Sequence, residues 1–73
     1  MYYNDMIKNL DKDLKKLILN FGAVEAGNIS GYPYTDLSAW IHGHIKFAIG
    51  KKIIIHDALQ KEKERREKLN DKN

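Results

Sequence analysis

The chain contains no cysteine among its 73 residues, and it has only one proline and one tryptophan. The absence of cysteine excludes disulfide bonds and thiolate metal sites, and it favours a reducing compartment. No apolar run approaches the ~20 residues that span a bilayer. The first residues also lack a basic segment followed by an apolar core, so no secretory signal is predicted. We therefore expect a cytoplasmic protein.

The chain also has little net charge. Its 13 basic side chains are largely offset by 10 acidic ones, which leaves a net charge of +3. This excess favours an anionic partner only weakly and is far below that of a histone-like coating protein. Residues 61–73 hold six basic and four acidic side chains, net +2, whereas the first 60 residues hold seven and six, net +1. A nucleic-acid partner would therefore require the basic groups to be concentrated on one face.

A chain of this length holds one small domain, and a hydrophobic content of 42% indicates a globular one. A first helix is predicted from about Asp5 to Asn20, capped by Asn4 or Asp5 and ended near Gly22. Its apolar residues recur at helical spacing and predict one buried stripe. These residues are Met6, Ile7, Leu10, Leu14, Leu17 and Ile18.

A second, short helix is predicted from Ala23 to Ile29, followed by a turn around residues 31–33. Gly27 lies within this helix, where it costs about 1 kcal/mol relative to alanine. Its presence indicates that another backbone passes close by.

A third helix is predicted to begin with Pro33, which suits the first helical position, and to end at Gly43. Leu37, Trp40 and Ile41 recur three to four residues apart, so they are expected to share the inward face.

A fourth helix is predicted to begin between Ile45 and Phe47. Its expected inward stripe consists of Ile45, Ala48, Ile49, Ile53, His56 and Leu59. From Lys61 onward only Leu69 is apolar, so a domain over residues 1–60 is expected to be followed by a charged helical extension or tail over residues 61–73. The pairs Glu62–Arg66 and Glu64–Lys68 favour continuation of the helix. A dimerising helix and a DNA-touching arm are the alternatives for this segment.

The segment from Gly31 to Gly43 resembles the core of the Cro/repressor-type (XRE-like) helix-turn-helix family. Gly31 matches the family's turn glycine, Leu37-Ser38 its aliphatic–serine pair, Trp40 its buried aromatic residue and Gly43 its closing glycine. The resemblance covers about residues 10–59. It implies an all-α domain of four or five helices, similar to lambda repressor, in which the helix at about residues 33–43 reads the major groove.

By this resemblance, one face of that helix and the loop after it contact DNA, while Leu37 and Trp40 anchor the opposite face. The expected contact residues are Tyr34, Thr35, Ser38, Ala39, His42, His44 and Lys46. Tyr34, Thr35 and Ala39 fall where the family contacts bases, and residues 44–46 fall where it holds the phosphate backbone.

The resemblance predicts a sequence-specific DNA-binding regulator, in particular a phage or mobile-element repressor. Its expected partners are double-stranded DNA and a second copy of the chain, bound to half-sites about one helical turn apart. Tyr2, Tyr3, Ile54 and Ile55, or the tail, are candidates for the dimer interface. The alternative is a small phage or mobile-element protein that uses the same fold to inhibit a host protein or another regulator. Asp36 and the modest net charge favour this alternative.

No enzyme is predicted, because no nucleophile lies in a recognisable motif with a base and an oxyanion site. His42, His44 and His56 lack the cysteine or well-placed glutamate that would complete a zinc site, so neither a metal nor a cofactor is expected. His42 and His44 are expected to contact phosphate, His56 to border the core, and Asp36 to cap its helix or pair with a lysine.

Overall fold

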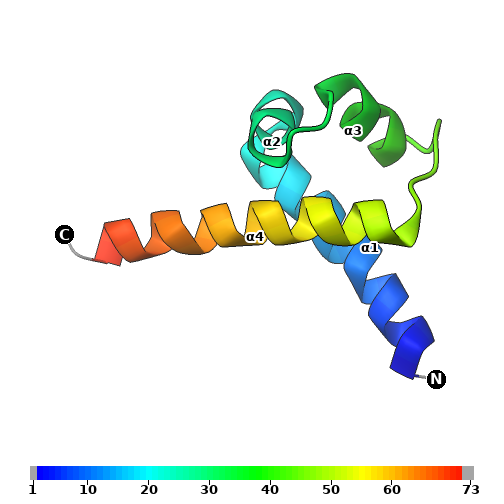
Figure 1. Cartoon of the computed structure of the whole chain (residues 1–73), viewed down its shortest axis with the longest axis horizontal. Helices are drawn as coiled ribbons and strands as arrows, with labels where there is room; N and C mark the ends of the chain where they lie inside the picture. The colour runs from blue at the N-terminus through cyan, green and yellow to red at the C-terminus, as the bar shows by residue number, and fades with distance from the viewer. Residues whose placement is uncertain (1, 72–73) are drawn as a thin grey trace.

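The computed structural model describes residues 2–71, with side chains described for residues 9–69. Within that range it contains four helices and no strand: α1 (Tyr2–Phe21), α2 (Ala23–Ser30), α3 (Tyr34–Ile41) and α4 (Ile49–Asp71). α1 and α4 cross each other, and α2 and α3 both lie on one side of α4 (Figure 1). The all-α, four-helix prediction is confirmed. No helix in the described range is long and apolar enough to cross a membrane.

α1 begins earlier than the sequence suggested. Asn4 and Asp5 lie inside a helix that starts at Tyr2, so the prediction that one of them caps it was wrong. The helix ends at Phe21, and Gly22 then adopts a φ of +90°, a conformation that side-chain-bearing residues rarely take. The amide of Gly22 donates to the carbonyl of Ile18 at 2.8 Å, which completes the last turn.

The described part of the α1 stripe packs as predicted. Leu14, Leu17 and Ile18 are buried and Leu10 is half-buried. Met6 and Ile7 lie outside the residues whose side chains the structure describes. Buried side chains of all four helices and of the segment before α4 form one core. It consists of Leu14, Leu17, Ile18, Ala26, Leu37, Trp40, Phe47, Ile55 and Leu59.

α2 runs from Ala23 to Ser30, and the close backbone approach predicted at Gly27 is present. A Cβ atom at Gly27 would lie 2.8 Å from the backbone oxygen of Tyr32 and 3.1 Å from the backbone nitrogen of Tyr34. Glycine therefore lets the chain leaving α2 fold tightly back on that helix before α3 begins. The reversal starts at Gly31, which adopts a left-handed conformation with φ +83°.

α3 begins at Tyr34, so Pro33 is its N-cap residue rather than its first helical residue. Leu37 and Trp40 are buried and Ile41 is half-buried, which confirms the predicted inward face. The ring of Trp40 stacks on that of Phe47, with centroids 5.5 Å apart and an interplanar angle of 12°. This pair joins α3 to the segment that leads into α4.

Two hydrogen bonds close the end of α3. The amide of Gly43 donates to Trp40 at 3.0 Å, and that of His44 donates to Ala39 at 2.8 Å. Gly43 supports this Schellman arrangement with a φ of +80°. The predicted role of Gly43 in ending the helix is confirmed.

The prediction for α4 was wrong in both its start and its face. The helix begins at Ile49, after an irregular segment over residues 42–48. Phe47, Ile55 and Leu59 are buried in the core, and His56 is half-buried. Four residues of the predicted stripe are exposed, namely Ile45, Ala48, Ile49 and Ile53, and only Leu59 is fully buried as expected.

The candidate dimer residues are affected by this rotation of α4. Ile55 is fully buried and is therefore excluded from any surface, whereas Ile54 is 56% exposed. The side chains of Tyr2 and Tyr3 lie outside the described residues.

The charged extension continues α4 without a break to Asp71, so the expected boundary after residue 60 falls inside one helix. Arg66 ties this extension to the rest of the molecule. Its guanidinium pairs with Glu62 one turn away and with Glu25 of α2, and it lies 5.0 Å from the ring centroid of Phe21. The Glu62–Arg66 pair was predicted; Glu64 instead accepts a hydrogen bond from Gln60 at 3.3 Å.

Acidification is expected to loosen this extension. Hydrogen bonds from Arg65 and Arg66 lower the pKa of Glu62 from 4.5 to about 2. A lowered folded-state pKa contributes stability that is complete above pH 4.5 and is lost as the pH falls towards 2. Protection factors of amides in residues 62–69, taken relative to the intrinsic exchange rate at each pH, should therefore fall over this window more in the wild type than in Glu62→Gln. An equal loss of protection in both proteins would exclude Glu62 as the titrating group.

Candidate nucleic-acid interface

The outward face of α3 carries the residues expected to read bases. Tyr34 is 52% exposed and Thr35 is also exposed, while Ser38 and Ala39 are half-buried one turn later. Leu37, at 0% exposure, lies on the side of the same helix opposite Thr35. α3 therefore presents an aromatic ring, hydroxyls and methyl groups to solvent, while its buried side packs against the core.

The loop after α3 places two exposed histidines side by side. The rings of His42 and His44 stack, with centroids 6.3 Å apart. His42 Nδ1 lies 2.8 Å from the backbone oxygen of Ser38, so in the tautomer that carries a proton on Nδ1 it donates to that carbonyl. This contact holds the ring against the end of α3 and leaves Nε2 as the free ring nitrogen. Lys46 follows in the same loop and is exposed.

Three lysines that the sequence analysis did not assign to the site lie against its supporting aromatic rings. Lys51 Nζ lies 5.1 Å from the centroid of Tyr32 and 4.9 Å from that of Phe47. Lys15 and Lys52 approach the Trp40 ring at 5.7 and 6.0 Å. Such cation–π contacts hold positive charge next to α3. Phe47 lies in the irregular segment before α4, so no helical spacing connects it to Lys51 and the sequence held no signal for these contacts.

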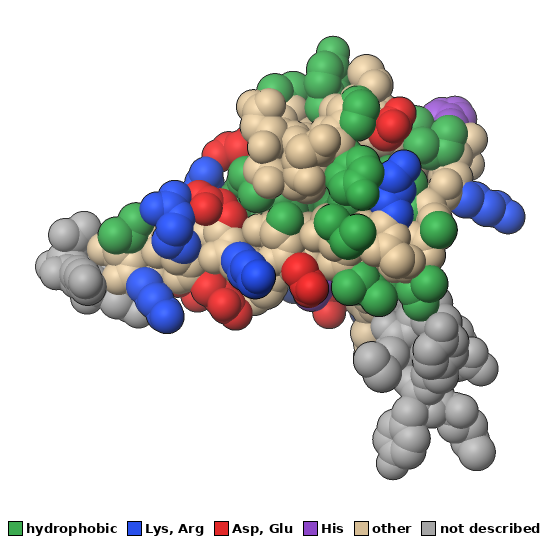
Figure 2. All heavy atoms as spheres, in the orientation of Figure 1, with side chains coloured by type: hydrophobic (Ala, Val, Ile, Leu, Met, Phe, Trp, Pro, Cys, Tyr) green, Lys and Arg blue, Asp and Glu red, His purple; other side chains and the backbone are tan. Residues whose placement is uncertain are grey.

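The positive charges are not all free, and on the face drawn in Figure 2 they do not gather in one patch. Lys52 Nζ forms an ion pair with Asp11 at 2.8 Å. Figure 2 shows acidic and basic side chains interspersed along the second half of α4, whereas single basic side chains lie beside α3 and at its far end. The electrostatic contribution to binding an anionic partner is therefore local to α3 and its following loop.

The N-terminus of α3 has unused backbone donors. Pro33 provides no side-chain cap, and its carbonyl already accepts from Asp36 and Leu37, at 3.1 and 3.3 Å. Among the described residues, the Asp36 carboxylate has neither a hydrogen bond nor an ion pair, so both roles expected for it are absent. Asp36 is half-buried in the first turn of α3, where the positive end of the helix dipole stabilises a negative side chain.

A shallow groove borders this end of α3. It has a volume of about 400 Å³ and runs between α2 and the turn into α3. Val24 and Tyr34, which are 59% and 52% exposed, lie along it, and Gly27 forms part of its floor. The groove therefore adds an apolar surface next to the candidate base-reading residues.

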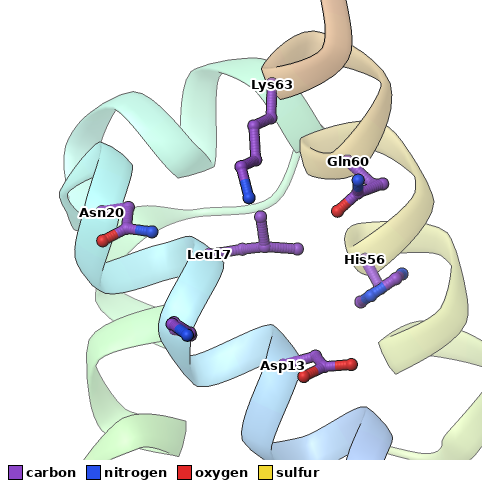
Figure 3. A pocket seen from close by; sticks show the side chains of 7 residues that line it. Asp13, Leu17, Asn20, His56, Gln60 and Lys63 are labelled. Carbon is purple, nitrogen blue, oxygen red and sulfur yellow. The ribbon is translucent and has the colours of Figure 1, made fainter. Parts of the chain in front are cut away.

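A polar cavity of about 230 Å³ lies apart from α3, between α1 and α4 (Figure 3). Asp13 of α1 and His56 of α4 lie at one end of it, and Lys63 lies at the other. The cavity is lined by charged side chains of both signs and by the apolar side chain of Leu17. Within residues 9–69, no three histidine or carboxylate side chains come together in a way that could hold a metal ion.

The comparisons with known proteins give no further guide to this surface. The chain matches no protein-family model, no curated protein and no solved structure.

Proposed function

We propose that the chain is a sequence-specific DNA-binding regulator, of the kind that phages and mobile elements use as repressors, and that α3 reads the major groove. In this proposal α2, the turn at residues 31–33 and α3 form a helix-turn-helix unit of the lambda-repressor type. One observation carries the proposal: α3 is anchored by Leu37 and Trp40, while Thr35 on its opposite face and Tyr34 at its first turn are exposed to solvent.

The exposed groups suit base edges. The Thr35 hydroxyl both donates and accepts hydrogen bonds, and the methyl groups of Thr35 and Ala39 suit contact with thymine methyls. Tyr34 adds an aromatic ring and a hydroxyl at the start of the helix. Sequence discrimination is assigned to these three positions.

The phosphate backbone is assigned to the groups around them. Lys46 supplies an exposed basic side chain, and His44 and His42 supply ring nitrogens in the same loop. The free amides at the start of α3 are further donors for a phosphate oxygen. These contacts fix the orientation of α3 without reading sequence.

Substitutions separate base contacts from phosphate contacts. Thr35→Ala and Tyr34→Ala should each weaken binding to the selected site by about 5- to 150-fold, a loss of about 1–3 kcal/mol, and leave non-specific binding almost unchanged. Lys46→Ala should weaken both and lower the slope of log K against log salt by about 1. Fluorescence anisotropy with the best site selected from random DNA measures all three.

Lys61→Ala is the matched control for Lys46→Ala, because Lys61 is also exposed but lies on α4 beyond the core. It should leave the salt slope unchanged. If selection from random DNA enriches no motif, or if none of the three α3 and loop variants alters binding, the proposal is wrong.

A second candidate is a protein that inhibits a host protein or another regulator through the same surface. The groove beside Val24 and Tyr34 favours this function, because it is apolar and open, whereas phosphate recognition needs charge. If the protein is folded but does not bind DNA even at low salt, inhibition of another protein becomes the favoured function.

A further inference from the structure

The polar cavity between α1 and α4 holds apart the charged side chains of two packed helices. Its walls consist of Asp13, Lys16, Leu17 and Asn20 of α1 and of His56, Gln60 and Lys63 of α4. Among the described side chains, no hydrogen bond or ion pair joins one wall to the other. The same two helices do pair directly elsewhere, where Lys52 Nζ lies 2.8 Å from Asp11. The separation of the polar walls is therefore a local feature of this cavity.

The polar groups of the α1 wall have no partner in the described part of the chain. Asp13, Lys16 and Asn20 form no side-chain hydrogen bond and no ion pair with any side chain described. On the other wall Lys63 Nζ reaches only Glu67 of its own helix, at 4.0 Å. The Asp13 carboxylate and the ammonium groups of both lysines are therefore available to a ligand.

The two signs of charge lie at opposite ends of the cavity, with an apolar floor between them. Asp13 lies on one side of Leu17, and Lys63 points towards Leu17 from the other side (Figure 3). Leu17 is 5% exposed and belongs to the core, so this floor is fixed. Asn20, at the same end as Lys63, follows Asp13 by seven residues, which is about 10 Å along a helix.

We propose that this cavity binds a small linear zwitterion, in which an amine and a carboxylate are joined by a short methylene chain. The ammonium group of the ligand binds the Asp13 carboxylate, and its methylene chain covers Leu17. Its carboxylate binds the ammonium group of Lys63, with the Asn20 amide as a second donor.

The arrangement of charge selects this class of ligand over simpler ions. A plain anion held by Lys63 would gain nothing from Asp13, and a plain cation held by Asp13 would gain nothing from Lys63. A ligand that carries both charges at its two ends gains both contacts. The cavity volume of about 230 Å³ is below the range of about 300–1,000 Å³ that holds drug-sized molecules, so it suits a ligand of a few carbon atoms.

The site is separate from the proposed DNA surface, because none of its residues belongs to α3 or to the loop after it. A ligand that contacts both α1 and α4 binds only when the two helices are packed together. It should therefore raise the thermal midpoint of unfolding by mass action.

An NMR titration of amide resonances with 6-aminohexanoate tests the proposal without DNA. Because exposed ion pairs contribute little each, we expect a dissociation constant on the order of a millimolar, with saturable shifts confined to the two walls of the cavity. Hexanoate and hexylamine, which each keep one of the two charges, should bind about fivefold more weakly.

Two variants assign the ends of the ligand. Asp13→Asn should weaken binding of 6-aminohexanoate by about fivefold and leave that of hexanoate unchanged, whereas Lys63→Gln should do so and leave that of hexylamine unchanged. Lys61→Gln is the matched control, since Lys61 is an exposed lysine of α4 outside the cavity, and it should change each affinity by less than about twofold. Circular dichroism establishes that all three variants are folded.

Three results would overturn the proposal. Shifts that stay linear up to about 100 mM 6-aminohexanoate, or that saturate at residues away from the cavity, would show that no such site exists there. Hexanoate or hexylamine that binds as tightly as 6-aminohexanoate would make the cavity a site for a simple ion. Equal weakening by Lys63→Gln and Lys61→Gln would reduce the effect to the net charge of the protein.

Discussion

Replacing Trp40 with alanine is expected to lower the free energy of unfolding by about 3–5 kcal/mol. The side chain is only 7% exposed, it stacks on Phe47, and the ammonium groups of Lys15 and Lys52 approach its ring. Removing the indole leaves a cavity between α3, α1 and α4 and deprives both lysines of a contact. A domain of this size has a total stability of about 4–11 kcal/mol, so much of the variant should be unfolded at room temperature.

Urea denaturation followed by circular dichroism measures this loss, and Tyr34→Ala is the matched control. Tyr34 is also aromatic and also lies on α3, but it is 52% exposed, so its replacement should change stability by less than about 0.5 kcal/mol. Similar losses in the two variants would mean that α3 is rotated about its axis. In that case the face assigned to DNA would be the buried one.

The helix boundaries around the glycines were predictable because each depends on local chemistry. Gly22, Gly31 and Gly43 all adopt positive φ at or next to helix ends, which is a property of the backbone that sequence reveals directly. The inward face of α3 was predictable for a related reason. Leu37 and Trp40 are its large apolar residues at helical spacing, and its other positions offer no competing stripe of that size.

The face of α4 was not predictable in the same way. Ile53, Ile54 and Ile55 point in three directions on a helix, so a stripe through Ile49 and Ile53 and a stripe through Ile55 and Leu59 are equally regular. Packing decides between them: Ile55 and Leu59 are fully buried in the core, while Lys52 pairs with Asp11 of α1 and approaches Trp40. The irregular segment before α4 then allows Phe47 to stack on Trp40.

The candidate site shows the same division. Exposure of Thr35 follows from the amphipathic pattern of α3, so sequence alone could place it, whereas Tyr34 shares a side with Leu37 and is exposed because it lies at the first turn. The positions of Lys15 and Lys51 beside the rings under α3 depend on how α1 and α4 cross behind it. Long-range contacts of this kind leave no periodic signal, and the tie between Arg66 and Glu25, 41 residues apart, is a further example.

Gly27→Ala is expected to cost about 1–3 kcal/mol of stability, although alanine is the better helix former. The added methyl group would lie 2.8 Å from the Tyr32 oxygen and 3.1 Å from the Tyr34 nitrogen, and both are backbone atoms that cannot rotate away. The chain between α2 and α3 must therefore move. Since α3 follows directly, its outward face moves with it, and affinity for the selected DNA site should fall by more than the change in folded fraction explains.

Gly50→Ala is the matched control for this substitution, because it makes the same chemical change in a helix where the new Cβ meets nothing within 4 Å. It should stabilise the fold by about 0.4–1 kcal/mol, chiefly by restricting the unfolded chain. Thermal unfolding of both variants shows directly whether Gly27→Ala lowers stability while Gly50→Ala raises it. If Gly27→Ala also stabilises the protein, the turn between α2 and α3 has room that the structure does not show, and the fixed placement of α3 on which base reading depends is lost.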